Sequence, residues 1–352
     1  MRKYYIDNIR ILCILLLFPF HTAMIFNNYG ENWYVHSKGS EAASLFLIAV
    51  YPWWMAILFA MAGMSAVYAL NKRTAKEYLN ERIHKLLIPT IAAILLLVPV
   101  QTYIANRSFN GYSGNYLEHL RFFFRLTDWS GYDGHFTTGQ LWFTLYLYLY
   151  SYCFLSLMVW YKNRDKKLKG EKFTLIKLIP MFILIALVTP VLDIGGKSIS
   201  EFAAYFLLGY FVLSMEEVQE RLKKYSALLA VFWVALIIWR CIMYQKGLGE
   251  GLLWEIQQRL LSWVGILAVL GIGRRYLEFN NKFTSYFTPA AFPLYIFHQT
   301  IIVITGYFTI SRIDGFLTQY VIICLTSFGL TIAMYELCRR IRVTRFLFGI
   351  KK

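Results

Sequence analysis

Long apolar stretches separated by short polar segments run along nearly the whole chain. A bilayer core about 30 Å thick needs about 20 apolar residues per helical span, so this pattern predicts membrane-spanning helices. Ten runs fit this length, namely 9–27, 44–70, 86–105, 139–161, 174–193, 199–215, 227–244, 254–272, 288–309 and 315–337. Only a tight turn at DIGGK separates the fifth run from the sixth, so eight or nine spans remain an alternative. We therefore predict an all-α, polytopic membrane bundle of about ten transmembrane helices.

The positions of the cations orient this predicted bundle. Of the 36 lysines and arginines, 27 fall at the N-terminus, at the C-terminus and in alternate segments between the runs. Because cytoplasmic loops carry the excess of basic residues, both termini are predicted to be cytoplasmic. We expect one membrane domain over 1–340 and a short basic cytoplasmic tail over 341–352. The long opposite loop, 106–138, is rich in aromatic residues and glycine, which suits a lid, a sugar-facing surface or an ordinary amphipathic loop.

The amino-acid composition limits the kinds of function that this chain can have. The chain is 58% hydrophobic with a mean hydropathy of +0.48, and 16% of its residues are charged, against about 25% in soluble domains. The net charge of +16 does not indicate a nucleic-acid partner, because no stretch is polar enough to fold as a soluble basic domain. The five cysteines lie in or beside apolar runs without metal-ligand spacing, so no metal site is expected. The partner that composition predicts is the lipid bilayer.

The first apolar run, DNIRILCILLLFPFHTAMIF, carries unusual polar residues. Arg10 and His21 are separated by eleven positions, which places both on one face of a helix, and Asp7 lies near the same stripe. Pro19 removes an amide donor, so we expect a kink there and a carbonyl freed near Leu15. A neutral imidazole is the side chain best suited near pH 7 to deprotonate a hydroxyl, which makes His21 a candidate general base. The structural alternative is a helix-to-helix hydrogen bond from His21, with Asp7 simply pairing with a snorkelling Arg10.

These residues resemble a known family. Asp7-Asn8-Ile9-Arg10 followed by His21 after ten residues resembles the first span of the integral-membrane acyltransferase family 3. The strings YYIDNIR, PFHTAMIF, WYVHS, LWF, YELCRRI and FLFG occur in an order similar to that of its glucan biosynthesis protein C branch, which O-succinylates periplasmic glucans. The resemblance implies a multi-pass enzyme of the bacterial cytoplasmic membrane. It would transfer an acetyl or succinyl group from cytoplasmic acyl-CoA, its donor substrate, to a hydroxyl of an extracytoplasmic carbohydrate, with no bound cofactor.

The resemblance also implies roles on the cytoplasmic side. The family shows two arginines three residues apart at the entry of the third span, where this chain has Arg82 and Lys85. With Arg73 they are candidates for binding the donor phosphates, although interfacial anchoring explains them equally. In LFAMAGMSA the family's serine before the glycine is replaced by Ala62, so no serine role transfers, and Gly63 is interpreted as a close-packing residue.

Two further segments contribute candidate residues to the expected site. The fourth span opens with Gln140-Leu141-Trp142-Phe143 where the family often has His-Leu-Trp-Phe, so Gln140 and Trp142 are supporting candidates. A tryptophan at this place is more often an anchor at the membrane interface than a wall of an acceptor site, so Trp142 has that alternative explanation. The ninth span contains FPLYIFHQTII, in which Pro293 should kink the helix and His298 and Gln299 lie near the membrane centre. They are predicted to support His21, or to bond between helices.

Two other function classes remain open. A transporter or flippase of a glycan precursor would also use a polar stripe and kinked helices, although no inverted repeat is visible in the sequence. A sensor or scaffold without chemistry would leave Arg10 and His21 unexplained. The sequence contains no GxSxG elbow, zincin motif, Walker loop or metal-spaced His/Cys cluster, which argues against a hydrolase triad or a metalloenzyme.

Overall fold

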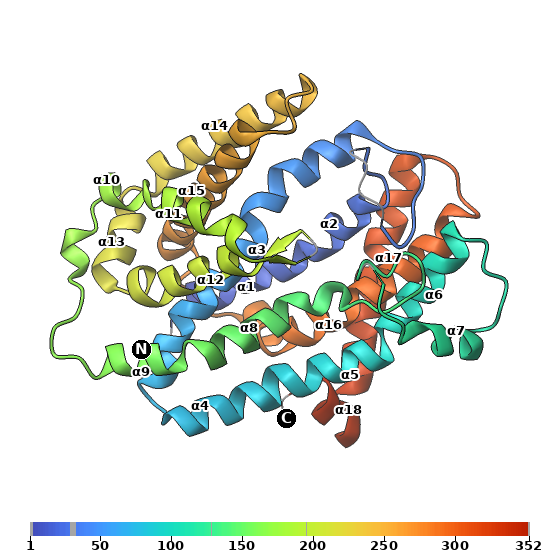
Figure 1. Cartoon of the computed structure of the whole chain (residues 1–352), viewed down its shortest axis with the longest axis horizontal. Coiled ribbons are helices and arrows are strands. Elements are labelled where there is room, and N and C mark those ends of the chain that lie inside the picture. Colours follow the sequence, from blue (N-terminus) through green and yellow to red (C-terminus); the bar gives the residue numbers. More distant parts are fainter. Residues whose placement is uncertain (1–2, 29–32, 128, 195, 351–352) are drawn as a thin grey trace. The chain divides into compact units, whose positions relative to one another are not determined.

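The computed structural model describes residues 3–28, 33–127, 129–194 and 196–350 (Figure 1). Contacts divide the chain into two units, which are described separately: unit 1 comprises Met1–Cys13, Ile48–Arg82 and Tyr146–Ser285, and unit 2 comprises Ile14–Leu47, Ile83–Leu145 and Tyr286–Lys352.

The helices and strands follow in chain order. They are α1 (Tyr4–Leu15), α2 (Leu17–Met24), α3 (Glu41–Leu70), α4 (Ala75–Arg82), η1 (Ile83–Leu87, a π-helix), α5 (Ile88–Leu96), α6 (Val98–Phe109), α7 (Tyr116–Phe123), η2 (Gly139–Leu141), α8 (Trp142–Cys153), α9 (Leu155–Lys162), η3 (Gly170–Lys172), α10 (Leu175–Leu178), α11 (Met181–Val188), η4 (Thr189–Val191), β1 (Asp193–Ile194), β2 (Lys197–Ser198), α12 (Ile199–Leu208), η5 (Gly209–Leu213, a π-helix), α13 (Glu216–Lys224), α14 (Ser226–Gln245), α15 (Leu252–Tyr276), α16 (Lys282–Ile310), α17 (Phe316–Cys338) and α18 (Arg342–Leu347).

Seven helices of the described residues are long and apolar enough to cross a membrane. They are Tyr4–Met24, Glu41–Leu70, Ala75–Phe109, Ser226–Gln245, Leu252–Tyr276, Lys282–Ile310 and Phe316–Cys338. Two bent pairs, Gly139–Cys153 with Leu155–Lys162 and Ile199–Leu213 with Glu216–Lys224, raise the number to nine if each is one span. The predicted all-helical class of a multi-pass membrane protein is confirmed. The count of ten and the cytoplasmic termini stay predictions.

The fifth predicted run is shorter than a full span. Its apolar helical part covers Leu175–Val191 and is divided into α10, α11 and η4. Pro180 stands at the cap of α11 and Pro190 lies in η4, and each lacks the amide that a continuous helix would use. After this run the chain forms a small antiparallel ladder, in which Asp193 pairs with Ser198 and Ile194 with Lys197.

Within unit 1, close approach of main chains packs α3 against α12 and η5. A Cβ atom added at Gly63 would lie 1.9 Å from the carbonyl oxygen of Phe206, and one added at Gly209 would lie 2.0 Å from the carbonyl oxygen of Ala60. Lipid tails are as apolar as side chains, so helices in a bilayer associate largely through such close packing of small residues. The predicted interpretation of Gly63 as a packing residue therefore agrees with its surroundings.

A buried ionic cluster joins three helices of unit 1. Arg259 of α15 pairs with Glu201 of α12 at 3.3 Å and with Glu255 at 2.5 Å. Arg240 of α14 donates to Gln257 Oε1 at 2.9 Å, and its guanidinium carbon lies 3.5 Å from the centroid of the Trp254 ring. The helices α14 and α15 themselves lie side by side (Figure 1). Both arginines are buried beside partners, as charges in an apolar environment must be.

In unit 2 the first span is interrupted at Leu16, a single residue that separates α1 from α2. Pro19 follows within one turn and donates no amide, and the ladder resumes with Phe20 N donating to Leu16 O at 3.0 Å. The α2 segment then packs on α17, where Tyr320 donates its hydroxyl to the Pro19 carbonyl at 3.0 Å. The helix α16 runs unbroken through Pro289 and Pro293.

The expected basic tail carries structure as far as residue 350, and its last two residues lie outside the described part. Helix α18 packs on α5, as in Figure 1. The ring of Phe348 meets Phe297 of α16 edge to face at 4.8 Å, and Ile350 is buried. The chain after residue 340 is therefore held on unit 2 by apolar contacts, while Arg342 is exposed and Arg345 is partly exposed.

Candidate active site

The side chain of His21 lies in a cluster of rings within unit 2. Its imidazole stacks on the indole of Trp33, with ring centroids 5.8 Å apart and planes inclined by 15°. The centroid of the His298 imidazole lies 5.1 Å away. The sequence predicted that both histidines lie at similar depth, and the structure brings their rings together. The His21 residue is partly exposed whereas His298 is fully buried, so only His21 can be reached directly from outside the cluster.

A backbone contact fixes the tautomer of His298. Its Nδ1 lies 2.6 Å from the carbonyl oxygen of Tyr295, one turn earlier in α16. A carbonyl can only accept, so Nδ1 carries the proton and Nε2 keeps its lone pair. Among the residues that the structure describes, none forms a hydrogen bond with this Nε2. The ring therefore holds an unused proton acceptor beside His21.

Buried amides connect the histidine pair to two other elements. The Nε2 of Gln299 donates to Gln101 Oε1 at 2.9 Å, and the Nε2 of Gln101 lies within bonding distance of Gln140 Oε1 (3.1 Å) and Thr300 Oγ1 (2.7 Å). Gln140 in turn donates to the Ile296 carbonyl at 2.9 Å. Interhelical hydrogen bonds in membranes contribute about 0.6 kcal/mol each on average, so the chief effect of this network is to fix positions.

A left-handed glycine places Gln140 in this network. Gly139 has a φ of +51°, a conformation that disfavours residues with a Cβ atom, and it starts the single turn η2 before α8. In this turn the carbonyl of Gln140 accepts a hydrogen bond from the Tyr295 hydroxyl. Trp142 starts α8 and meets Phe143 edge to face at 6.4 Å, and Phe143 packs on Tyr295 at 5.6 Å. Gln140 is thus a hydrogen-bonding member of the amide network. Trp142 is connected to the network through the rings of Phe143 and Tyr295.

The remaining first-span candidates lie in unit 1. Arg10 Nη1 pairs with Asp7 Oδ1 at 2.9 Å, and Arg10 Nη2 donates to the Ser65 hydroxyl at 3.4 Å. Ser65 belongs to LFAMAGMSA, two residues after Gly63, and its hydroxyl also donates to Met61 O at 2.7 Å. No role was predicted for a serine in this segment. The Asp7–Arg10 pair and the histidine pair are in different units and are described separately.

The three basic donor candidates differ in their surroundings. Arg73 pairs with Glu81 at 3.0 Å. The guanidinium carbon of Arg82 lies 4.7 Å from the centroid of the Tyr78 ring, and Lys85 is part of the π-helix η1. Single π-helical turns inside α-helices occur often at functional sites. Arg73 is therefore partly neutralised by a carboxylate, while Arg82 lies against a neutral ring.

Sequence reasoning did not single out Gln101, Tyr295, Thr300 or Trp33. Gln101 offered the same signal that identified the histidines, since it is an amide within the apolar run 86–105. Tyr295 acts through its main-chain carbonyl and its hydroxyl, which no pattern marks. Trp33 lies in the segment after α2, and the position of a loop side chain depends on tertiary structure that periodicity does not encode.

Comparison with known proteins places this geometry in context. The sequence model of the acyltransferase 3 family, described as an acyltransferase domain, matches residues 3–336. Glucans biosynthesis protein C of Salmonella typhi is 22% identical over 377 aligned positions, which cover 99% of this chain and 95% of that protein. The proteins of the same name from Salmonella typhimurium (22%) and Salmonella paratyphi B (21%) are covered to the same extent. No solved structure gave a significant match.

Proposed function

We propose, on the premise that this chain belongs to the acyltransferase 3 family, that it is a membrane O-acyltransferase acting on a carbohydrate. In this proposal an acetyl or succinyl group moves from cytoplasmic acyl-CoA to a hydroxyl of an extracytoplasmic glycan, an EC 2.3.1-type reaction. The name of the Salmonella relatives supports glucan as the acceptor class. The enzyme would work in the bacterial cytoplasmic membrane as a multi-pass protein.

The observation that carries this proposal is the adjacency of His21 and His298. His21 would take the proton from the acceptor hydroxyl as the oxygen attacks the thioester carbonyl. A new C–O bond forms, the C–S bond breaks, and the proton is returned to the departing CoA thiolate. Since like charges 5.1 Å apart disfavour each other, the two imidazoles would hold one proton between them at a time.

His298 and the amide network would position the base rather than touch the substrate. With Nδ1 bonded to the Tyr295 carbonyl, His298 is held in one orientation beside His21. Gln299 and Gln140, tied together through Gln101, would keep α16 and the start of α8 from separating during the reaction. Stacking on Trp33 would limit rotation of the His21 ring. Such preorganisation lowers the barrier because the geometry does not have to be created at the moment of reaction.

The basic residues would serve the donor. Arg10, held by Asp7, would steady the inner end of the donor path. Arg82 and Lys85, with Arg73 beside them in the chain, would attract the CoA phosphates. Arginine binds phosphate through a planar fork of donors and lysine as a point charge, so Arg82 should contribute more than Lys85.

Mass spectrometry of envelope glycans tests the proposed activity. We would compare cells that lack the gene, cells that express the wild-type protein and cells that express His21→Gln at equal membrane abundance. Acyl-bearing glycans should appear only with the wild-type protein. The matched control is His36→Gln, which makes the same change at an exposed histidine and should retain acylation. Unmodified glycan that moves between compartments in a gene-dependent way would instead support a transporter or flippase.

A further inference from the structure

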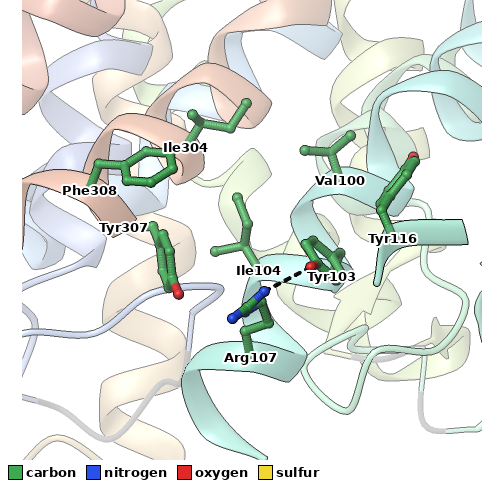
Figure 2. Close-up of a pocket in the computed structure, with 8 residues that line it drawn as sticks. All are labelled: Val100, Tyr103, Ile104, Arg107, Tyr116, Ile304, Tyr307 and Phe308. Carbon is green, nitrogen blue, oxygen red and sulfur yellow. Dashed lines mark hydrogen bonds between the residues drawn. The ribbon is translucent and has the colours of Figure 1, made fainter. Parts of the chain in front are cut away.

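An open pocket of ≈530 Å³ lies between the final turns of α6 and α16 within unit 2 (Figure 2). Most of its lining is apolar: Val100 and Ile104 come from α6, and Ile304 and Phe308 come from α16. The histidine pair and the amide network do not line it. The mechanism proposed above leaves this pocket without a role.

One cation marks an end of this pocket. Arg107 is exposed in the last turn of α6, and its Nη1 donates to the Tyr103 hydroxyl at 2.9 Å. Figure 2 shows the Tyr307 ring of α16 beside the Arg107 guanidinium. Among the described residues no carboxylate pairs with Arg107, so its charge is available to a ligand. The pocket therefore combines an apolar wall with a cation and phenol hydroxyls.

The position of the pocket along its helices matches the edge of a bilayer. Both walls lie in the C-terminal parts of candidate membrane spans, Ala75–Phe109 and Lys282–Ile310. Aromatic residues and arginine at span ends lie at the depth of lipid headgroups. The next helix, α7, begins with a capping box between Asn115 and Glu118 and exposes Leu117, of which 74% is accessible. Phe124 and Leu126, just after α7, are also exposed. A helix with such an apolar outer face is typical of one that lies in the membrane interface.

A buried histidine, His119, contacts residues of the pocket wall on the side away from the pocket. His119 of α7 lies 3.0 Å from the Thr102 hydroxyl through Nε2 and packs against the rings of Tyr103 (5.4 Å) and Tyr116 (6.5 Å). Both tyrosines line the pocket. Because their rings are held by a buried partner, the pocket is formed before any ligand binds, which lowers the entropic cost of binding.

We propose that this pocket binds an anionic phospholipid, with its phosphate on Arg107 and the upper part of an acyl chain against Val100, Ile104 and Ile304. A guanidinium fork matches two phosphate oxygens, and the tyrosine hydroxyls can donate to the ester oxygens. A carbohydrate would need several acceptors for its hydroxyl groups, and none of the described residues that line the pocket has a carboxylate or amide side chain. The lipid would hold together the ends of α6 and α16, the helices that carry Gln101 and His298.

Native mass spectrometry of the full-length protein in detergent tests this site. Phosphatidylglycerol is the probe, and diacylglycerol, which lacks the phosphate, is the matched neutral lipid. The wild-type protein should retain phosphatidylglycerol about tenfold better than Arg107→Gln, since the variant loses a charge-assisted contact with the lipid phosphate. The control Arg121→Gln removes the same charge from an exposed position on α7 and should bind like the wild type. Diacylglycerol retention should be equal in all three proteins.

A second variant and two soluble competitors complete the test. Ile304→Trp should fill the apolar part and lower the retention of both lipids, provided that the melting temperature is unchanged. Equal retention of phosphatidylglycerol by wild type and Arg107→Gln would overturn the proposal. So would displacement of the lipid by inorganic phosphate, which would indicate a simple anion site, or by glucan oligosaccharide, which would indicate a sugar subsite. Failure of both competitors supports the phospholipid, and it leaves the proposed acyl transfer to be judged separately by glycan analysis.

Discussion

The imidazole rings of His21 and His298 lie 5.1 Å apart, one contributed by the first span and the other by α16. Their environments differ, because His298 is buried with Nδ1 bonded to a carbonyl, whereas His21 is partly exposed and stacked on Trp33. His21 can therefore contact a substrate directly, whereas His298 can act only through His21.

We expect His21→Gln to lower kcat for acyl transfer by about 10²- to 10⁴-fold, because glutamine can bond but cannot take up the proton. His298→Gln should lower kcat less and shift the pH profile, since it removes only the neighbouring acceptor. The measurement is turnover of labelled acyl-CoA with glucan in nanodiscs. Equal kcat for wild type and His21→Gln would refute the general-base role.

Arg82→Gln should raise the KM for acyl-CoA by up to about fivefold while kcat is largely kept, because a partly exposed, solvent-screened cation contributes about 1 kcal/mol or less to binding. The effect should shrink as salt screens the phosphates. Arg73→Gln should have a smaller effect, since Glu81 already pairs with Arg73. Lys85→Arg should not raise KM. A salt series of initial rates measures all three variants, and an unchanged KM in Arg82→Gln would place donor entry elsewhere.

Gly63→Ala should destabilise the protein by about 1–3 kcal/mol, because the new Cβ would meet the Phe206 carbonyl at 1.9 Å and a main chain cannot rotate away. Gly329→Ala in α17 is the matched control, since no atom of the described residues lies within 4 Å of a Cβ there. It should be neutral or slightly stabilising. Melting temperatures in detergent measure both, and equal shifts would contradict the close packing of α3 on α12.

His119 should make stability depend on pH. Burial lowers the pKa of His119 below its ordinary value of 6.5. As the pH falls through this value, the unfolded chain binds a proton that the folded chain does not, so the native state loses stability. The melting temperature of the wild type should therefore fall more between about pH 7.5 and about pH 5.5 than that of His119→Gln. Parallel curves for the two proteins would count against this assignment, and His36→Gln provides the exposed control.

Reporter fusions test the predicted orientation. A reporter after Lys352 should be cytoplasmic, and one inserted at residues 110–115, between α6 and α7, should be on the other side. Both reporters on one side would require an odd error in the number of spans between the two positions.

Much of the helical architecture could be predicted because apolar length alone marks a span. The length of a span is harder to predict where prolines divide an apolar run, as at Pro180 and Pro190. The composition stays apolar there although the helix ends. The histidines and Gln140 stood out as polar residues in or beside apolar segments. Their connection through Gln101 and the Tyr295 carbonyl depends on helix rotation and on tertiary contacts, which a single sequence does not encode.

The paired glycines of α3 and η5 also restrict how this protein can change. Gly63 faces the main-chain carbonyl of Phe206, which is in α12 just before η5. Gly209 faces the main-chain carbonyl of Ala60 in α3. Every residue type has that carbonyl, so no substitution on the opposite helix can make room for a side chain. No second mutation can therefore compensate for a larger residue at Gly63 or Gly209. The sequences of the two segments can change at other positions, but these two must stay glycine.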